Sequence, residues 1–336
     1  MTIKDIAAKC GVSVSTVSRV LNNQPYVKQD VRDKVMKVIE EEHFVPHEGA
    51  VSLAKTQEDS FGVIIRGINN PFFSEMVTVI LQRGHEMGYS TYLHQIRSCD
   101  DEIGEAASLA KSRKLKGVIL LGGNFDRTEE EIRQIDVPIV CCTFTNKFGV
   151  VPKEIFSSVS IDDEAAAYKA VSYLISEGHK KIAVVLPSVD DKSISELRYM
   201  GYCKAMKEAG LAVTDDLIIA TGDYSMEEAY AGVKAALERK AKFTAIFGIS
   251  DLIALASMKA LSDAGYKIPG KCSVIGIDGI DMTSYFIPTL TTLVQPRDVI
   301  AQRAVEILIG AIEEPGEGTH EIVEAQLRIG ESVKKI

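Results

Sequence analysis

Apolar residues recur at helical spacing in the first part of the chain. The pattern predicts a helix over residues 3–10, with Thr2 and Asp5 in the positions of a capping box. Gly11 provides a stop for this helix, and Ser13 can cap a second one through its hydroxyl. Two short helices joined by a tight, glycine-containing turn are typical of a helix-turn-helix.

The second helix has two faces of different character. Its apolar face consists of Val17, Val20 and Leu21, and the opposite face carries Val14, Ser15, Ser18, Arg19 and Asn22. A further apolar repeat, over residues 31–39, supplies a third helix that can close a small core. The second helix, with its small polar face, has the width that fits the major groove of DNA. The alternative is an amphipathic helical hairpin with a solvated face.

From Ser60 onward, short apolar runs alternate with segments of helical periodicity. The predicted strands are 61–66, 91–96, 118–121, 138–143, 182–186, 217–220, 245–249 and 273–277. The predicted helices are 73–86, 101–114, 128–134, 161–177 (with a strand end), 196–208, 226–239 and 252–264. Continuous apolar strands alternating with helices predict parallel sheets covered on both faces. Because the rhythm restarts after residue 143, we expect two doubly wound subdomains.

The last part of the chain follows the same plan. Residues 290–295 are expected to cross back to the first subdomain, where 297–312 form a helix, and residues 322–327 to return to the second. Three crossings between the subdomains predict a clamp that closes about a hinge.

Charge separates the head from the body. Residues 1–39 hold seven Lys/Arg and three Asp/Glu, and the other 297 residues hold 31 and 44, which gives net charges of +4 and −13. This asymmetry is expected if only the head meets phosphate. No apolar signal sequence follows Met1 and no apolar stretch of about 18 residues can span a bilayer, so we expect a cytoplasmic protein.

The head motif TIKDIAAKCGVSVSTVSRVLNN, followed by Pro46, Ala50 and Leu53, resembles the DNA-binding head of the LacI/GalR family of bacterial transcriptional regulators. The resemblance extends over the whole chain. It implies a helix-turn-helix domain over 1–46, a hinge helix or linker over 47–58, and an effector-binding and dimerisation body over 59–336. Within the body, it implies a first subdomain of about 60–160 plus 292–320 and a second of about 162–289 plus 322–336.

DNA contacts are implied by the same resemblance. They are expected from Thr2, Val14, Ser15, Thr16, Ser18, Arg19, Asn22 and Leu53. In the family, the hinge helix orders on DNA and wedges a leucine into a base step of the minor groove, and Leu53 is the matching residue. The hinge departs from the family's pattern at His47, Glu48, Gly49 and Val51, and a plain flexible linker is the alternative.

Polar and aromatic residues follow the carboxyl ends of the predicted strands, where open α/β sheets bind their ligands. Asn70, Pro71 and Phe72 follow the first strand, and Asp162, Asp251 and Asp278 follow later ones. For Asp162 and Asp251, each of which opens a helix, a capping role is the alternative.

The family resemblance implies an effector site in the cleft between the subdomains. It assigns the aromatic lining to Phe72, Phe73 and Tyr224, and polar contacts to Asp162, Asp278 and Arg198, with Lys192 at a position that tunes specificity. Asp251 is a further candidate carboxylate. Ser250 stands where sugar-binding members often carry asparagine. A solvated helix residue is the alternative interpretation of Arg198.

No catalytic motif is present, no cofactor is expected, and His43 and His47 straddle Pro46, which argues against a shared metal. The six cysteines are expected to be reduced and buried. The sequence therefore predicts a dimeric DNA-binding regulator that acts as a repressor on a palindromic operator. A small polar effector, for which a carbohydrate is the first candidate, is expected to control it. A solute-binding protein and a sugar-active enzyme on the same body are the alternatives.

Overall fold

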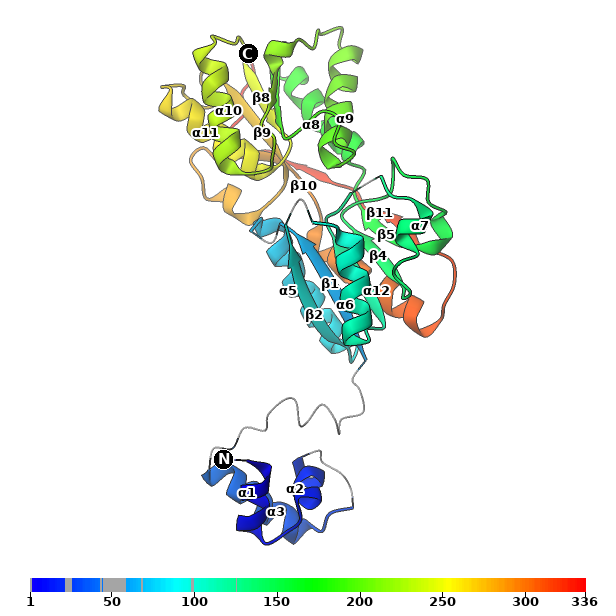
Figure 1. The fold of residues 1–336 in the computed structure, drawn as a ribbon. Helices are drawn as coiled ribbons and strands as arrows, with labels where there is room; N and C mark the ends of the chain where they lie inside the picture. The colour runs from blue at the N-terminus through cyan, green and yellow to red at the C-terminus, as the bar shows by residue number, and fades with distance from the viewer. Residues whose placement is uncertain are drawn as a thin grey trace. The chain divides into compact units, whose positions relative to one another are not determined.

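The computed structural model describes residues 2–21, 26–42, 44, 59–67, 69–97, 100–124 and 126–336. They belong to two compact units, Met1–Asp59 and Ser60–Ile336, called the head and the body below (Figure 1).

The head is a bundle of three helices, α1 (Ile3–Cys10), α2 (Val14–Leu21) and α3 (Gln29–Glu41). The predicted capping box is present, since the Thr2 hydroxyl accepts from the Asp5 amide and the Asp5 carboxylate accepts from the Thr2 amide. Gly11 ends α1 with a φ of 62°, a left-handed conformation that glycine adopts without strain. The helices enclose a core of Ile6, Ala7, Cys10, Val17, Val20 and Val35.

The first subdomain of the body is built on a six-stranded parallel sheet with the order β11-β5-β4-β3-β1-β2. Its strands are β1 (Ser60–Arg66), β2 (Ser90–Ile96), β3 (Gly117–Leu121), β4 (Ile139–Cys142), β5 (Ser157–Ser160) and β11 (His320–Ile322). Its helices are α5 (Pro71–Glu86), α6 (Glu102–Arg113), α7 (Glu129–Ile132) and α12 (Arg297–Glu313). Helices α5 and α12 pack together (Figure 1).

The second subdomain repeats this plan with the strand order β12-β10-β9-β8-β6-β7, in which only β12 is antiparallel to its neighbour. Its strands are β6 (Ile182–Leu186), β7 (Ile218–Ala220), β8 (Ala245–Gly248), β9 (Ser273–Asp278), β10 (Thr291–Val294) and β12 (Gln326–Arg328). Its helices are α8 (Asp163–Ser176), α9 (Ile194–Glu208), α10 (Met226–Glu238) and α11 (Asp251–Asp263), which pack as the pairs α8/α9 and α10/α11. The predicted fold class, a helical head and two doubly wound subdomains, is confirmed.

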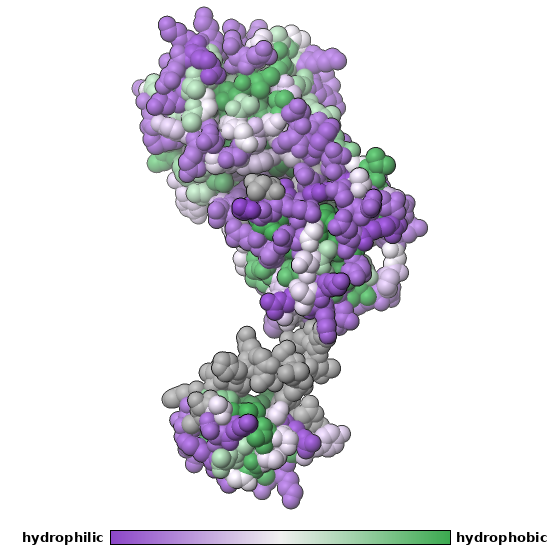
Figure 2. All heavy atoms as spheres, viewed as in Figure 1, coloured by the Kyte–Doolittle hydropathy of each residue, from purple (hydrophilic) through white to green (hydrophobic). Residues whose placement is uncertain are grey.

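Strand β4 shows how both faces of a sheet are buried. Cys141 packs in the apolar cluster of one face and Cys142 in that of the other, as expected for neighbours on a strand. Burial raises the pKa of both thiols, so they stay protonated. All cysteines of the described residues are free, and all but Cys203, which is partly exposed, are buried as predicted; Cys99 lies outside that part of the chain. Hydrophilic residues cover most of the visible face of the body (Figure 2).

The end of the chain corrects two boundaries. Residues 291–294 were expected in the first subdomain, but they form β10 of the second sheet, paired with β9, and the chain crosses only at Gln295–Arg297. The run 322–327 was expected to return to the second subdomain. It splits instead into the end of β11 and the start of β12, because the chain crosses between the sheets within it. Three crossings remain, as predicted.

Candidate DNA-binding and effector sites

The outward face of α2 presents groups that are available to another molecule. The Ser13 hydroxyl caps the helix by accepting from the Thr16 amide at 3.2 Å, as predicted. Val14 is 40% exposed, Ser15 and Arg19 are exposed, and Thr16 and Ser18 are partly exposed. Among the described residues, Arg19 has neither a hydrogen bond nor an ion pair. Its guanidinium therefore keeps all its donors for an outside acceptor.

The other three predicted DNA contacts, Thr2, Asn22 and Leu53, are not among these residues of α2. The Thr2 side chain is exposed, and its hydroxyl takes part in the capping box of α1 with Asp5. Asn22 and Leu53 lie outside the described residues, as does the whole predicted hinge, residues 47–58.

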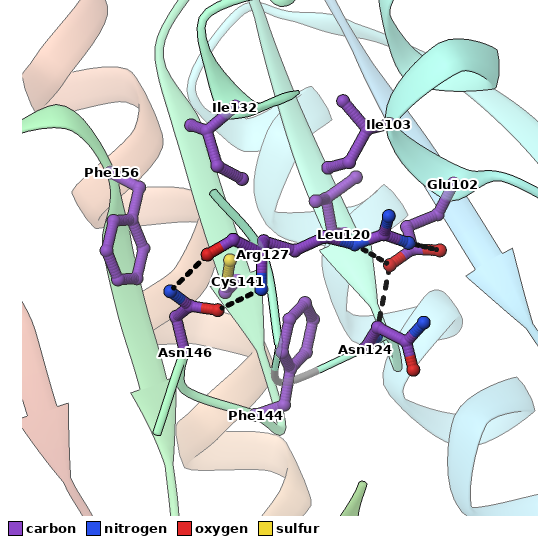
Figure 3. Close-up of a pocket in the computed structure, with 10 residues that line it drawn as sticks. All are labelled: Glu102, Ile103, Leu120, Asn124, Arg127, Ile132, Cys141, Phe144, Asn146 and Phe156. Carbon is purple, nitrogen blue, oxygen red and sulfur yellow. Dashed lines mark hydrogen bonds and ion pairs between the residues drawn. The ribbon is translucent and has the colours of Figure 1, made fainter. Parts of the chain in front are cut away.

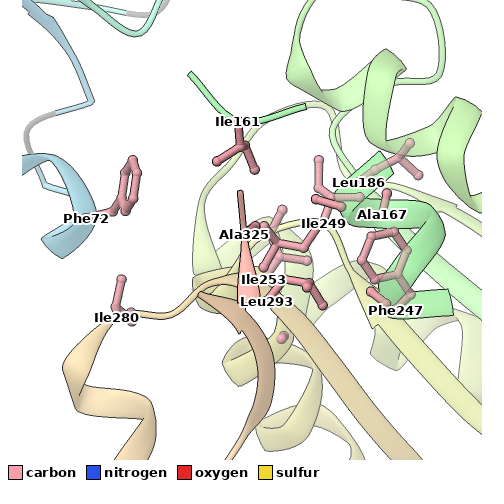
Figure 4. Packing of buried hydrophobic residues seen from close by; sticks show 14 of the residues in the cluster. Phe72, Ile161, Ala167, Leu186, Phe247, Ile249, Ile253, Ile280, Leu293 and Ala325 are labelled. Carbon is pink, nitrogen blue, oxygen red and sulfur yellow. The ribbon is translucent and has the colours of Figure 1, made fainter. Parts of the chain in front are cut away.

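In the body, the aromatic pair at the start of α5 lies where the two subdomains meet. The Asn70 side chain caps α5 by accepting from the Phe72 amide at 3.1 Å, which fixes the first turn. The Phe72 ring is 3% exposed and meets the Phe73 ring edge to face, with centroids 5.4 Å apart. Phe72 shares an apolar cluster with Ile161, at the first crossing, and with Ile280 of the second subdomain (Figure 4).

The centre of the predicted effector site is Arg198, which is 2% exposed on α9. Its Nε donates to Asp163 Oδ1 at 2.8 Å, and its Nη1 donates to Asp278 Oδ1 at 3.4 Å and to the Ile249 carbonyl. Burial opposes the charge of Arg198, but the two carboxylates outweigh it and raise the pKa of the guanidinium. Arg198 is therefore not the solvated helix residue of the alternative interpretation.

Asp278 sits at the end of β9 in an unusual backbone conformation. Its φ of 131° lies in a region that residues with side chains rarely occupy, and Gly279 follows with a φ of 77°. Gln295 Nε2 donates to Asp278 Oδ1 at 2.8 Å. Strain of this kind persists where surrounding contacts enforce it, and it gathers at ligand sites.

Asp251 stabilises the turn that follows Asp278 through hydrogen bonds. Its carboxylate accepts from the Gly279 amide at 2.7 Å, from the Ile280 amide at 2.9 Å and from the Thr292 hydroxyl at 2.5 Å, and the residue has no exposed surface. The cap of α11 is Ser250 rather than Asp251. Asp251 thus holds Asp278 in place, and its oxygens face its own subdomain.

The crossover after β5 carries two adjacent aspartates with different roles. Asp162 is exposed and caps α8 by accepting from the Ala165 amide at 3.0 Å, which is the alternative that the sequence left open. Asp163 turns inward, is 4% exposed and pairs with Arg198. Sequence reasoning missed Asp163, and it missed Gln295, although both are polar residues at the carboxyl ends of strands.

Tyr224 and Lys192 lie nearer the surface. Tyr224 is 39% exposed, and its hydroxyl lies 3.1 Å from Ser193 Oγ. Lys192 has a φ of 54°, and its Nζ lies 4.9 Å from the centre of the Phe148 ring, which belongs to the first subdomain.

The first subdomain holds a buried ionic cluster that the sequence did not indicate. Glu102, at the start of α6 and 1% exposed, accepts from Arg127 and from the Asn124 amide (Figure 3). It also accepts from Arg66. Burial disfavours the Glu102 charge, but the hydrogen bond from Arg127 and the charge of Arg66 outweigh it and lower its pKa. The adjoining cavity has a volume of about 10 Å³, roughly what one water needs, so it cannot hold a metabolite.

Comparison with known proteins agrees with this geometry. Residues 2–47 match the lacI family of bacterial regulatory proteins, and residues 171–333 match the periplasmic binding protein-like domain. The HTH-type transcriptional regulator MalR of Clostridium butyricum is 40% identical over 97% of this chain and 97% of its own. This chain belongs to the LacI family.

Two solved structures extend the likeness over the full length. The complex of the transcriptional regulator CelR with cellobiose has a TM-score of 0.72 at 25% identity and covers 99% of both chains. The Lac repressor dimer bound to operator and the anti-inducer ONPF has a TM-score of 0.76 at 22% identity, again over 99% of both chains, which shows the shared fold.

The relatives found are transcriptional regulators and not enzymes. Across the described residues, no group of three or more His, Cys, Asp and Glu side chains could hold a metal ion. In the same part of the chain, no helix is both long enough and apolar enough to cross a membrane.

Proposed function

We propose that this chain is a dimeric transcriptional repressor that reads a palindromic operator through α2 and releases or retains it according to a small polar effector in the body. The observation that carries the proposal is the pairing of two unlike sites in one chain. One is a helix face whose arginine has no partner among the described residues. The other is a buried, strained Arg198–Asp278 site at the carboxyl end of β9 in the second subdomain. This function would place the protein in the cytoplasm.

DNA reading is assigned to the exposed face of α2. We assign base contacts to Val14, Ser15 and Arg19, backbone contacts to Thr2, Thr16, Ser18 and Asn22, and a minor-groove wedge to Leu53. An arginine can make a bidentate contact with guanine, and a two-fold dimer favours a palindrome. Residues 1–46 act here as the DNA-binding domain, 47–58 as the hinge and 59–336 as the effector-binding body.

A carbohydrate is the effector that suits the site. Asp163 and Asp278 can accept hydrogen bonds from vicinal hydroxyls, Arg198 can donate, and Phe72, Phe73 and Tyr224 offer flat surfaces. Asp162 and Lys192 stand at the edge of the site, and Asp251 acts through Asp278. More carboxylates than cations face the site, so a neutral polyol fits better than a dianion. The cellobiose complex of the similar regulator CelR supports this class.

The test has two stages. Selection from randomised duplex DNA with the purified protein should yield a palindromic sequence, and analytical ultracentrifugation should give a dimer on it. Titration of that complex with a panel of neutral sugars, sugar phosphates and nucleobases, followed by fluorescence anisotropy, should then show one class that changes the operator affinity. Recovery of no preferred sequence would remove the DNA-binding assignment, and a response confined to anionic ligands would remove the neutral carbohydrate.

A further inference from the structure

Beyond the effector site itself, the two subdomains touch through a contact that we call the latch. It consists of the loop after β4 in the first subdomain, Lys147 and Phe148, and of Glu164, Lys192 and the first turn of α9 in the second. Lys147 Nζ lies 3.2 Å from Glu164 Oε2, and Lys192 Nζ lies 4.9 Å from the centre of the Phe148 ring. Both contacts join one subdomain to the other, and Lys192 also pairs with Glu196 of its own subdomain, with Nζ 3.9 Å from Oε1.

The first turn of α9 also carries an apolar part of the latch. Leu197 is 4% exposed and packs in the cluster that covers one face of the first sheet, together with Phe144 and Phe156. Ile194, one turn earlier, packs against the same cluster, as does Phe148. Apart from Ile194 and Leu197, the described members of this cluster all come from the first subdomain. The second subdomain thus inserts two side chains of one helix face into the core of its neighbour.

The latch is built so that it can open. The side chains of Lys147 and Lys192 are 44% and 49% exposed. At such sites both the Lys147–Glu164 ion pair and the cation–π contact of Lys192 with Phe148 are weak in water. No sheet hydrogen bond has to break when Leu197 leaves the cluster, because each sheet is complete within its own subdomain. The contact can therefore come apart while both subdomains stay folded.

The latch is joined to the effector site through the same helix turn. Arg198, the next residue after Leu197, projects about 100° further around α9 and bonds Asp163 and Asp278. Ser193, next to Lys192, contacts the Tyr224 hydroxyl. A shift of α9 by a ligand at Arg198 must move Leu197, because the two are fixed on one rigid turn.

We propose that this latch sets the balance between open and closed arrangements of the body, and that the effector acts by shifting the first turn of α9 against the cluster around Phe144. This inference rests on the proposed function for its effector arm. The latch itself can be tested without effector or DNA.

The protein offers a direct reporter because its sequence contains no tryptophan. Phe148→Trp in the full chain places a single indole in the latch and keeps an aromatic face for Lys192. Acrylamide quenching of its emission then measures how far the latch is open. In the Phe148→Trp background, Lys147→Glu should raise the quenching constant roughly two-fold or more, because it turns an attraction to Glu164 into a repulsion. The double reversal Lys147→Glu/Glu164→Lys should restore the original value.

Leu197→Ala should raise quenching as well, with circular dichroism confirming that the variant is folded. Lys204→Ala is the matched control: this lysine lies on the same helix, 5.4 Å from the Tyr168 ring, but both residues belong to the second subdomain. It should leave quenching unchanged. The latch is overturned if Lys147→Glu has no effect, if the double reversal does not restore quenching, or if Lys204→Ala opens it equally. None of these outcomes depends on an effector or an operator, so they stand apart from a failure of the proposed function.

Discussion

At the scale of single residues, the decisive feature is how each charged side chain is partnered. Arg19 on α2 has no hydrogen bond or ion pair within the described residues, whereas Arg198 is enclosed by two carboxylates and a carbonyl. The same residue type is therefore open to an outside acceptor in one case and organises a buried site in the other.

Replacement of Arg19 should distinguish sequence-specific from non-specific DNA binding. We expect Arg19→Ala to lose preference at one base pair in each half-site, at a cost of roughly 1–3 kcal/mol, since a bidentate contact with guanine would be removed. Binding to unrelated DNA should persist, because phosphate contacts supply it. Lys37→Ala, on the exposed surface of α3, is the control and should leave sequence preference intact. A selected sequence identical to that of the parent protein would remove Arg19 from base reading.

The buried carboxylate of Asp251 makes stability depend on pH. Burial, with the nearby charge of Asp278, raises its pKa from 3.8 to about 7. The native state therefore holds a proton that the unfolded chain releases near pH 4, and the stability due to this group is full below that pH and is lost as the pH rises through about 7. Between pH 5.5 and 8 the free energy of unfolding should fall by about 1–2 kcal/mol because of this group.

Asp251→Asn should flatten that decline, measured as the free energy of unfolding in urea at several pH values. Its amide oxygen can still accept from Gly279 and Ile280, and its NH₂ group can donate to Thr292. The exposed helix cap Asp162, changed to Asn, serves as the control, and asparagine caps helices equally well. An unchanged slope in Asp251→Asn would mean that another group carries the pH dependence.

At the scale of elements, close contact between helices depends on single glycines. A Cβ built on Gly201 of α9 would lie 2.2 Å from the Glu164 carbonyl oxygen and 2.9 Å from the Tyr168 nitrogen, both on the backbone of α8. Neither atom can move without shifting the helix. The α8/α9 pair, and with it the position of Arg198, therefore requires glycine at this site.

Gly201→Ala should destabilise the body by roughly 1–3 kcal/mol or more, because an overpacked helix contact has to separate. Gly310→Ala in α12 provides the matched control, since a Cβ there meets no atom within 4 Å and alanine favours a helix by up to about 1 kcal/mol. Urea unfolding should move in opposite directions for the two variants. Equal stability of both would contradict the close packing of α8 on α9.

The elements themselves could be predicted from the sequence because their signals are local. Capping residues, helical periodicity and apolar runs place α1, α2 and eight of the twelve strands that the described residues form within a few residues of their observed bounds. The other four, β5, β10, β11 and β12, lie next to the crossings between the sheets, and their bounds were not predicted. The choice between Asp162 and Asp163 could not be made, because adjacent residues share the same local signal and only packing decides which turns inward. The cluster of Glu102 with Arg66 and Arg127 could not be predicted for a related reason, because its members lie far apart in the sequence and only the fold brings them together.

At the scale of the whole molecule, the body is two similar sheets joined by three crossings and by contacts such as that of Arg297. This residue follows the second crossing, pairs with Glu75 of the first subdomain, and donates to the Gly279 carbonyl and to Asp281 of the second. Arrangements of this kind close around ligands by hinge motion. A ligand that contacts both subdomains should therefore stabilise the body as a unit.

At about a hundred times its dissociation constant, an effector that binds only the folded body adds roughly 2.7 kcal/mol. For a body of this size the melting temperature should rise by roughly 5–10 °C. Tyr224→Ala should reduce this shift, because it removes an exposed aromatic surface without leaving a buried charge unpaired. Tyr92→Ala is a closely matched control, since Tyr92 is 38% exposed and Tyr224 39%, but Tyr92 lies on the edge strand β2.

Arg198→Lys tests the centre of the same site and is preferable to alanine, which would leave Asp163 and Asp278 unpaired in the interior. Lysine keeps the charge but loses the fork that bonds both carboxylates, so the melting shift caused by the effector should fall towards zero. Operator affinity of the unliganded protein should stay close to that of the parent chain, because α2 is untouched. A full melting shift in both Arg198→Lys and Tyr224→Ala would place the effector elsewhere in the molecule, whereas a shift lost equally in Tyr92→Ala would point to a general loss of stability.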